Sequence, residues 1–396
     1  MCNLQARGRA LWSPAVSERG RSVLCRNVIL AVTALAVAGC ATGPTSFAPV
    51  SAVPEGAVIE PLLVATTRAP SAEGALGYAT SRSAALSFAD VRVSIPPDRE
   101  PGDLNYPRRN VDPRRDFVAA GVETGLDRTA FEERLNERLS ALPAGERGVF
   151  VFVHGYNTDF AEGVFLQAQI AHDFEVPGTS VNFSWASAGM PPAYLFDRES
   201  AQIARDDLVE TLRIVARSAA TEVAVMGHSM GGVLVMEALR QLSLTGDTET
   251  LGRIGVVVLA SPDIDVDLFK RQYHAIAPKP PAWLIFVSRR DPALRASSRL
   301  RGGAPRVGSG SDVDELNRLG IAVIDLTTVG GRDLRGEHTR FASSPLVIAM
   351  IRDAERVRTS LGRSDARALE AAADDWNTLG ASVANVLRLP QAPARP

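Results

Sequence analysis

The feature that most constrains this chain is the pentapeptide Gly-His-Ser-Met-Gly at residues 227–231, which stands between two segments of different periodicity. Residues 222–226 have the apolar character of a short buried strand, and residues 230–242 have the apolar spacing of a helix. In a strand–turn–helix setting, G-x-S-x-G makes a sharp turn that exposes the serine, and the glycines leave room beside it. The sequence therefore predicts that Ser229 is a nucleophile at a strand–helix junction.

Short apolar runs alternate with helical patterns from residue 148 onward. The predicted strands are residues 148–153, 180–185, 222–226, 254–259, 283–287 and 321–326, after two earlier ones at 57–67 and 86–95. The predicted helices are residues 127–142, 159–174, 200–219, 230–242 and 345–359, and residues 96–116 are predicted to be an irregular loop. Such alternation predicts an α/β fold with a mostly parallel central sheet and helices on both faces. Function is then expected at the carboxyl ends of the strands.

A serine nucleophile needs a general base and an acid that orients it. The chain has five histidines, at positions 154, 172, 228, 274 and 338. In folds built around this turn the base comes last in chain order, and only His338 follows both the serine and a late acidic residue. Asp291, directly after the run 283–287, is the predicted acid, and Asp263 remains the alternative. Asp263 otherwise caps a helix or braces the rim of the site.

The charge that develops on a substrate oxygen needs two backbone N–H donors. Met230, directly after the nucleophile, is predicted to supply one. The second is expected from the loop after the run 148–153, where Gly155 allows close approach of the substrate and Tyr156 is the predicted donor. Tyr194, in the apolar segment 189–196, is a further candidate for the substrate pocket, with Gly155.

The bulk charge and the cysteines limit the classes of partner. Without its first 39 residues the chain has 38 basic and 44 acidic residues, which argues against nucleic acid as a partner. The three cysteines, Cys2, Cys25 and Cys40, all precede the predicted body, which therefore has no internal disulfide and no thiolate metal site. We expect neither a metal nor an organic cofactor.

The first 40 residues have the features of a secretory signal: arginines, then the apolar run 28–37, then small residues. Residues 37–40, Val-Ala-Gly-Cys, resemble the lipobox of bacterial lipoproteins, which implies lipidation of Cys40. Ala41 and Thr42 follow, rather than Asp, which resembles the pattern sent to the outer membrane. We expect a lipid-anchored protein of the cell envelope that faces the periplasm.

Several motifs together resemble the α/β-hydrolase superfamily and, more narrowly, the bacterial alpha/beta hydrolases of domain-of-unknown-function family 900. They are the residues 151–157 (VFVHGYN), 183–185 (FSW) with Tyr194 and Asp197, 227–231 (GHSMG), 261–265 (SPDID) and 66–68 (TTR). The resemblance covers residues 58–360. It implies an α/β-hydrolase fold and a hydrolase, and it implies little about the substrate.

These observations predict four regions: a lipoprotein signal at 1–40, a flexible linker at 41–57, an α/β-hydrolase domain at 58–362, and a C-terminal helix and tail at 363–396. The expected activity is hydrolysis of small-molecule carboxylic esters through an acyl-enzyme. Two alternatives remain open. One is an acyltransferase or thioesterase with the same triad, and the other is a non-catalytic envelope binding protein on the same fold.

Overall fold

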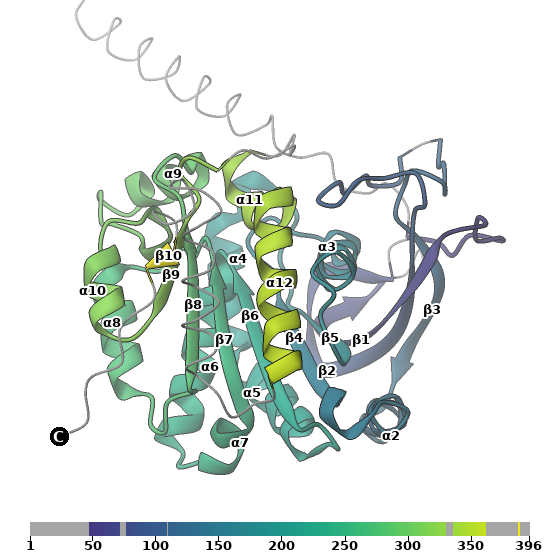
Figure 1. Ribbon diagram of the computed structural model, residues 1–396, viewed down its shortest axis with the longest axis horizontal. Helices are drawn as coiled ribbons and strands as arrows, with labels where there is room; N and C mark the ends of the chain where they lie inside the picture. The colour runs from purple at the N-terminus through teal and green to yellow at the C-terminus, as the bar shows by residue number, and fades with distance from the viewer. Residues whose placement is uncertain (1–46, 72–76, 109, 330–335, 362–386, 389–396) are drawn as a thin grey trace, which may run out of the picture. The chain divides into compact units, whose positions relative to one another are not determined.

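A single twisted sheet organises the computed structural model, which describes residues 47–71, 77–108, 110–329, 336–361 and 387–388 (Figure 1). Its strand order is β10-β9-β8-β7-β6-β4-β5-β1-β2-β3. The strands are β1 Val58–Pro70, β2 Tyr78–Ile95, β3 Val118–Leu126, β4 Gly148–Val153, β5 Thr179–Ser184, β6 Glu222–His228, β7 Ile254–Ala260, β8 Ala282–Val287, β9 Ala322–Asp325 and β10 Leu387–Arg388. Along this order, all neighbouring strands between β9 and β1 pair in parallel. Strand β10 extends one edge, and β2 and β3 extend the other, in antiparallel pairing. The predicted mostly parallel sheet is confirmed.

Helices cover both faces of this sheet. They are α2 Arg128–Ser140, α3 Phe160–Asp173, α4 Tyr194–Ile203, α5 Arg205–Arg217, α6 Met230–Leu244, α7 Thr248–Arg253, α8 Val266–Ala275, α9 Pro292–Leu300, α10 Val313–Arg318, α11 Arg340–Ser343 and α12 Pro345–Leu361. Apolar side chains of α2, α5, α6 and α8 pack in one core cluster, and those of α3, α11 and α12 pack in the clusters on the other face (Figure 1).

Strand β4 shows how the sequence builds two cores at once. Its residues read Gly-Val-Phe-Val-Phe-Val, and successive side chains of a strand point to opposite faces. The three valines, Val149, Val151 and Val153, join the core under α5 and α6. The two phenylalanines, Phe150 and Phe152, join the core under α3 and α12. Burial on both faces is what a continuous apolar strand in a parallel sheet provides.

The sequence predictions differ from the structure in several places, and helices α7, α8, α9 and α10 were not predicted. The single helix predicted at 200–219 is two helices, α4 and α5, that meet at the buried Ala204. The helix begins earlier than predicted, at Tyr194. Strand β3 was not predicted, because its sequence, VAAGVETGL, lacks a clear apolar alternation and its pairing with β2 decides its conformation.

The predicted signal and Cys40 lie outside the described residues, as does almost all of the predicted C-terminal region. Within residues 47–57, predicted as the second part of a flexible linker, Phe47 and Val50 contact the body. Phe47 is buried, with its ring 5.3 Å from the rings of both Phe160 and Phe165. The backbone N–H of Val50 donates to the carbonyl of Ala119 at 2.9 Å. No helix among the described residues is both long and apolar enough to cross a membrane.

We expect Phe47→Ala to lower the free energy of unfolding by about 3 kcal/mol, because it removes a buried aromatic ring and leaves a cavity. Urea denaturation followed by circular dichroism measures this change. Val53→Ala is the matched control, since Val53 is 39% exposed and its truncation should cost little. Equal stability of the two variants would show that the segment before β1 is a tether after all.

Candidate active site

Ser229 occupies a strained turn between β6 and α6. Its backbone has φ 52° and ψ −118°, a conformation that few residues other than glycine adopt. The neighbouring glycines make the turn possible. A Cβ at Gly231 would lie 2.3 Å from the carbonyl oxygen of Val153, and one at Gly227 would lie 2.7 Å from the Cα of Gly232. The first turn of α6 therefore sits directly against the end of β4.

Asp291 and His338 are joined by a short hydrogen bond at the carboxyl end of the sheet. Asp291 follows β8 and caps α9, where its Oδ1 accepts from the backbone N–H groups of Ala293 and Leu294. The Nδ1 of His338 donates to the other oxygen, Oδ2, at 2.6 Å. His338 lies in a short 3₁₀ turn, Glu337–Thr339, and its side chain is 19% exposed. The free Nε2 of this imidazole is thereby fixed as the proton-accepting nitrogen.

His228, the residue before Ser229, holds His338 from the other side. Its Nε2 lies 3.3 Å from the carbonyl oxygen of His338, and because a carbonyl only accepts, this nitrogen donates. The two rings are 4.9 Å apart, and the ring of Phe341 lies 5.2 Å from that of His228. These contacts place the predicted base beside the residue that precedes the predicted nucleophile.

The protonation of the histidines follows from their surroundings. Burial alone would lower the pKa of His338, but the charge and hydrogen bond of Asp291, with the field of Asp263, outweigh it and raise the pKa above the ordinary value. Burial lowers the pKa of His228 to about 3, with a smaller contribution from His338. Burial would raise the pKa of Asp291, yet His338 and the two backbone donors lower it. An ionised carboxylate thus faces a basic imidazole.

The loop after β4 lies against the nucleophile, as the predicted role of Gly155 requires. A Cβ at Gly155 would lie 2.9 Å from the Cβ of Ser229, so only glycine fits there. Tyr156 follows, and its hydroxyl donates to the carbonyl of Pro191. Its ring packs against that of Tyr194, with centroids 5.2 Å apart. Met230 is buried at the start of α6. Met230 and Gly155, the residue before Tyr156, therefore adjoin Ser229 from two elements.

The sequence reading missed the buried arginine that fixes this loop. Arg68, near the end of β1, is fully buried, and each of its guanidinium nitrogens has a partner. Nε donates to the hydroxyl of Ser184 at 2.9 Å, Nη1 to the carbonyl of Ser187 at 2.9 Å, and Nη2 to the carbonyl of Thr158 at 2.7 Å. The signal was present in the sequence, because an arginine within an apolar strand requires buried partners.

Asp197, from α4, completes the brace from the opposite side. It is fully buried and accepts from the backbone N–H of Asn157 at 3.0 Å, the hydroxyl of Ser187 at 2.6 Å and the backbone N–H of Ala188 at 2.7 Å. Asn157 has a positive φ of 55°, so this carboxylate holds a strained loop residue in place.

His154, directly after β4, has a structural role in the same loop. Its ring stacks on Trp185, with centroids 5.0 Å apart. Burial lowers its pKa to about 3, and Arg68 adds to this effect. The neutral ring has its Nδ1 2.9 Å from the carbonyl of Gly155 and its Nε2 near Arg68 and the carbonyl of Trp185.

Asp263, the alternative acid, has other partners. Its Oδ2 accepts from the hydroxyl of Tyr194 at 2.8 Å, and its Oδ1 accepts from the hydroxyl of Ser297 at 2.6 Å. Its backbone N–H donates to the carbonyl of Ser229 at 3.2 Å. Asp291 is therefore the carboxylate that pairs with His338, whereas Asp263 pairs with side chains in the wall of the site.

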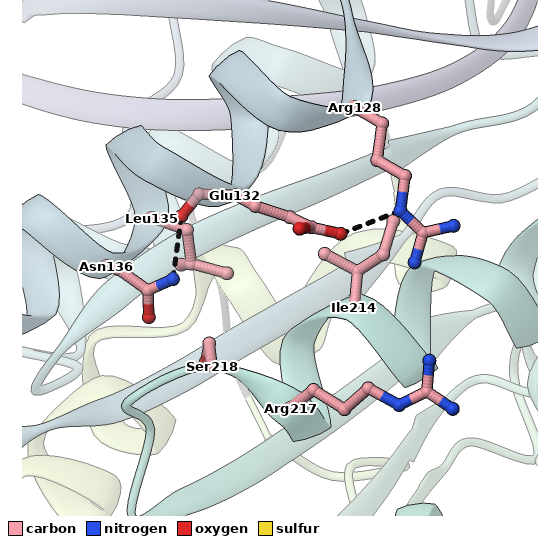
Figure 2. A pocket seen from close by; sticks show the side chains of 7 residues that line it. All are labelled: Arg128, Glu132, Leu135, Asn136, Ile214, Arg217 and Ser218. Atoms are coloured by element: carbon pink, nitrogen blue, oxygen red, sulfur yellow. Dashed lines mark hydrogen bonds and ion pairs between the residues drawn. The ribbon is translucent and has the colours of Figure 1, made fainter.

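The cavity drawn in Figure 2 is not lined by Ser229, Asp291 or His338. Its volume is about 230 Å³, and it is lined by Arg128, Glu132, Leu135, Asn136, Ile214, Arg217 and Ser218, from α2 and the end of α5 (Figure 2). Ser218 precedes β6, so this cavity lies toward the amino end of the strand whose carboxyl end carries Ser229. Among the described residues, no group of histidine, cysteine or acidic side chains is arranged to hold a metal ion.

The doubly covered parallel sheet, with a strained serine at the β6–α6 turn, defines an α/β-hydrolase fold. The chain belongs to the family described as "Alpha/beta hydrolase of unknown function (DUF900)", whose model matches residues 127–355, more than half of the chain. No curated protein sequence matches it.

Solved structures of enzymes with this fold are similar at low sequence identity. Aspergillus fumigatus lipase B is 14% identical with a TM-score of 0.34, and the match covers 54% of each chain. Esterase B from Lactobacillus rhamnosis is 12% identical with a TM-score of 0.35, and the match covers 90% of this chain and 99% of that one. A Rhizomucor miehei esterase is 14% identical with a TM-score of 0.30, covering 81% and 87%.

Three histidines lie in the region of the candidate site: His154, His228 and His338. We expect only His338 among them to gain a proton as the pH falls from 8 to 5. Its pKa is raised in the folded state, so the stability from its ion pair is present below the unfolded pKa and is lost as the pH rises through the folded pKa. NMR titration of the imidazole signals measures the pKa of each of these histidines. In Asp291→Asn the pKa of His338 should fall, whereas Asp325→Asn, at the end of β9, should leave it unchanged. Titration of His228 in the same range would contradict the assignment.

Proposed function

We propose that this protein is a serine hydrolase of carboxylic esters that acts through an acyl-enzyme on Ser229, with His338 as base and Asp291 as orienting acid. The observation that carries the proposal is the 2.6 Å bond from His338 to a buried Asp291, beside the strained turn that presents Ser229. A carboxylate that orients an imidazole beside a serine hydroxyl is the arrangement that nucleophilic acyl transfer uses.

The reaction would proceed in two halves. Ser229 attacks the ester carbonyl while the Nε2 of His338 takes the hydroxyl proton, and the oxyanion accepts hydrogen bonds from the backbone N–H groups of Met230 and Tyr156. Collapse breaks the bond to the alcohol, which leaves with the proton held by His338. Water then gives a proton to His338 and attacks the acyl-enzyme. The bond from the acyl carbon to Ser229 Oγ breaks, the acid is released, and His338 returns the proton to Oγ.

The braced loops support this assignment. An oxyanion hole stabilises charge only if its donors are already in position, because donors that must reorganise lose much of their effect. Arg68 and Asp197 hold the segment 157–158 and the segment 184–188 by buried hydrogen bonds, so the backbone directly after Tyr156 is held in place.

Substrates with short acyl chains fit this site best. The segment where a lid would be expected, before and within α4, is a brief 3₁₀ turn, Pro191–Ala193, followed by the helix itself. Its apolar side chains Met190 and Leu195 are 58% and 71% exposed. A large lid that encloses long chains is not formed by these described residues.

We expect Ser229→Ala to reduce ester hydrolysis by about 10⁶-fold, because the nucleophile acts as a unit with its base. The melting temperature should change little, since the hydroxyl supports no core packing. Hydrolysis of 4-nitrophenyl butyrate and labelling with a fluorophosphonate probe measure the effect. Ser243→Ala, on the same helix, is the control, because its hydroxyl donates to the carbonyl of Ala275 far from the turn.

The same assays separate the competing assignments. Asp291→Asn should cost about 10⁴-fold, and Asp263→Asn far less. A Ser229→Ala variant that keeps most of its activity would remove Ser229 from the mechanism. Absence of labelling in the native protein would favour a binding protein on the same fold, and faster transfer to added alcohols than to water would favour an acyltransferase.

We also propose that the protein is a lipoprotein, anchored through Cys40 on the periplasmic side of the outer membrane. The support is the basic, apolar and small-residue order of the first 40 residues. In a Gram-negative host, Cys40→Ala should abolish palmitate incorporation and shift the protein out of the membrane fraction. Cys25→Ala is the matched control. Palmitate on the Cys40→Ala protein would refute the anchor.

A further inference from the structure

Two arginines without full sets of partners lie in the wall of the proposed active site. Arg306 is 1% exposed, and none of its three guanidinium nitrogens makes a hydrogen bond with any described residue. Its nearest carboxylate oxygen, Oδ1 of Asp263, is 3.6 Å from Nε, beyond hydrogen-bond distance. A buried cation that lacks hydrogen bonds is costly, because burial removes the water that would otherwise satisfy it.

Arg301, at the end of α9, is the more accessible member of the pair. Its side chain is 18% exposed, its Nη2 donates to the hydroxyl of Tyr194, and its buried Nε has no partner among the described residues. Its Nη2 lies 3.8 Å from Oδ2 of Asp263. The guanidinium also lies over the ring of Tyr194, 5.2 Å from its centroid.

The acidic side chains of this cluster already accept hydrogen bonds from other groups. Both oxygens of Asp263 accept from hydroxyl groups, those of Tyr194 and Ser297. Asp265, the next acidic residue, uses its Oδ1 to cap α8 through the backbone N–H groups of Asp267 and Leu268. Two guanidinium groups therefore share one buried carboxylate, and donors remain to be satisfied.

Arg306 differs from the structural arginine Arg68 in how many hydrogen bonds its guanidinium group makes. Both Arg68 and Arg306 are essentially fully buried, but each nitrogen of Arg68 donates to a protein oxygen within 3 Å. Arg306 has no such bond among the described residues. The chain thus satisfies a buried arginine completely where the role is to brace loops, and leaves one unsatisfied near the nucleophile.

The cluster adjoins the reacting atoms through short contacts. The backbone N–H of Asp263 donates to the carbonyl of Ser229 at 3.2 Å. Tyr194, which contacts Asp263 and Arg301, packs against Tyr156 of the predicted oxyanion loop. Arg301 is therefore separated from the predicted oxyanion loop by the side chain of Tyr194.

We propose that the substrates are esters that carry an anionic group, carboxylate or phosphate, which Arg301 binds at the surface of the cluster and Arg306 attracts from beneath. This inference rests on the proposed ester hydrolysis. Guanidinium groups are the donors best matched to carboxylate and phosphate oxygens, since their planar forks bind two oxygens at once. An uncharged ester would leave these donors unsatisfied.

The test compares kcat/KM for matched anionic and neutral esters with the full-length protein. In the acyl arm, mono-4-nitrophenyl adipate is compared with 4-nitrophenyl hexanoate. In the alcohol arm, 4-acetoxyphenylacetate and 4-acetoxyphenyl phosphate are compared with 4-methylphenyl acetate, which also separates carboxylate from phosphate. In Arg301→Gln and in Arg306→Gln, the ratio of anionic to neutral kcat/KM should fall about tenfold or more in at least one arm.

Arg213→Gln is the matched control, because Arg213 is 29% exposed and pairs with Asp247 outside the cluster. It should leave the ratio unchanged. Fluorophosphonate labelling reports an intact triad in each variant, and Arg301→Gln decides the question if Arg306→Gln does not fold. Labelled variants with native ratios in both arms would overturn the anionic substrate and leave ester hydrolysis standing. A native protein that neither labels nor hydrolyses any ester would overturn both.

Discussion

The site depends on how closely helix α6 approaches strand β4. The first turn of α6 rests against the carbonyl oxygens of Val153 and His154, where a single added carbon at Gly231 would lie at 2.3–2.4 Å. This contact forces the sharp turn at Ser229, and the same approach brings the loop after β4 against the serine, so that Gly155 also has no room for a side chain. One packing contact thus brings the predicted nucleophile and the loop of the predicted oxyanion donor together.

Buried charge then fixes what packing alone leaves free. Loops at the carboxyl ends of β4 and β5 have no ladder partners of their own, and Arg68 and Asp197 replace those partners with hydrogen bonds to backbone groups. Burying a charge is favourable only when its partners are complete. Arg306, beside Asp263, departs from this rule, because its guanidinium nitrogens have no hydrogen-bond partner among the described residues.

The sequence predicted the parts of the structure that local patterns determine. The apolar runs gave the parallel strands, the pentapeptide gave the turn, and chain order gave His338 and Asp291, which are in contact; their catalytic roles stay predictions. What it missed depends on distant partners. Strand β3 exists because β2 lies beside it, and Phe47 is held by Phe160 and Phe165. Arg68 joins strand β1 to the end of β5 and to the loops after β4 and β5. The break at Ala204 likewise reflects packing within the helix layer.

The two oxygens of the Asp291 carboxylate have different partners, which limits the substitutions that this position can accept. One oxygen starts helix α9 and the other orients the imidazole, so the length of the side chain satisfies two requirements at once. A glutamate, which serves equally well in many such enzymes, would reach the ring only by abandoning the helix. Ser297 lies on that helix and Arg301 ends it, so the contacts around Asp263 and the orientation of the His338 ring depend on the same helix and cannot change independently in evolution.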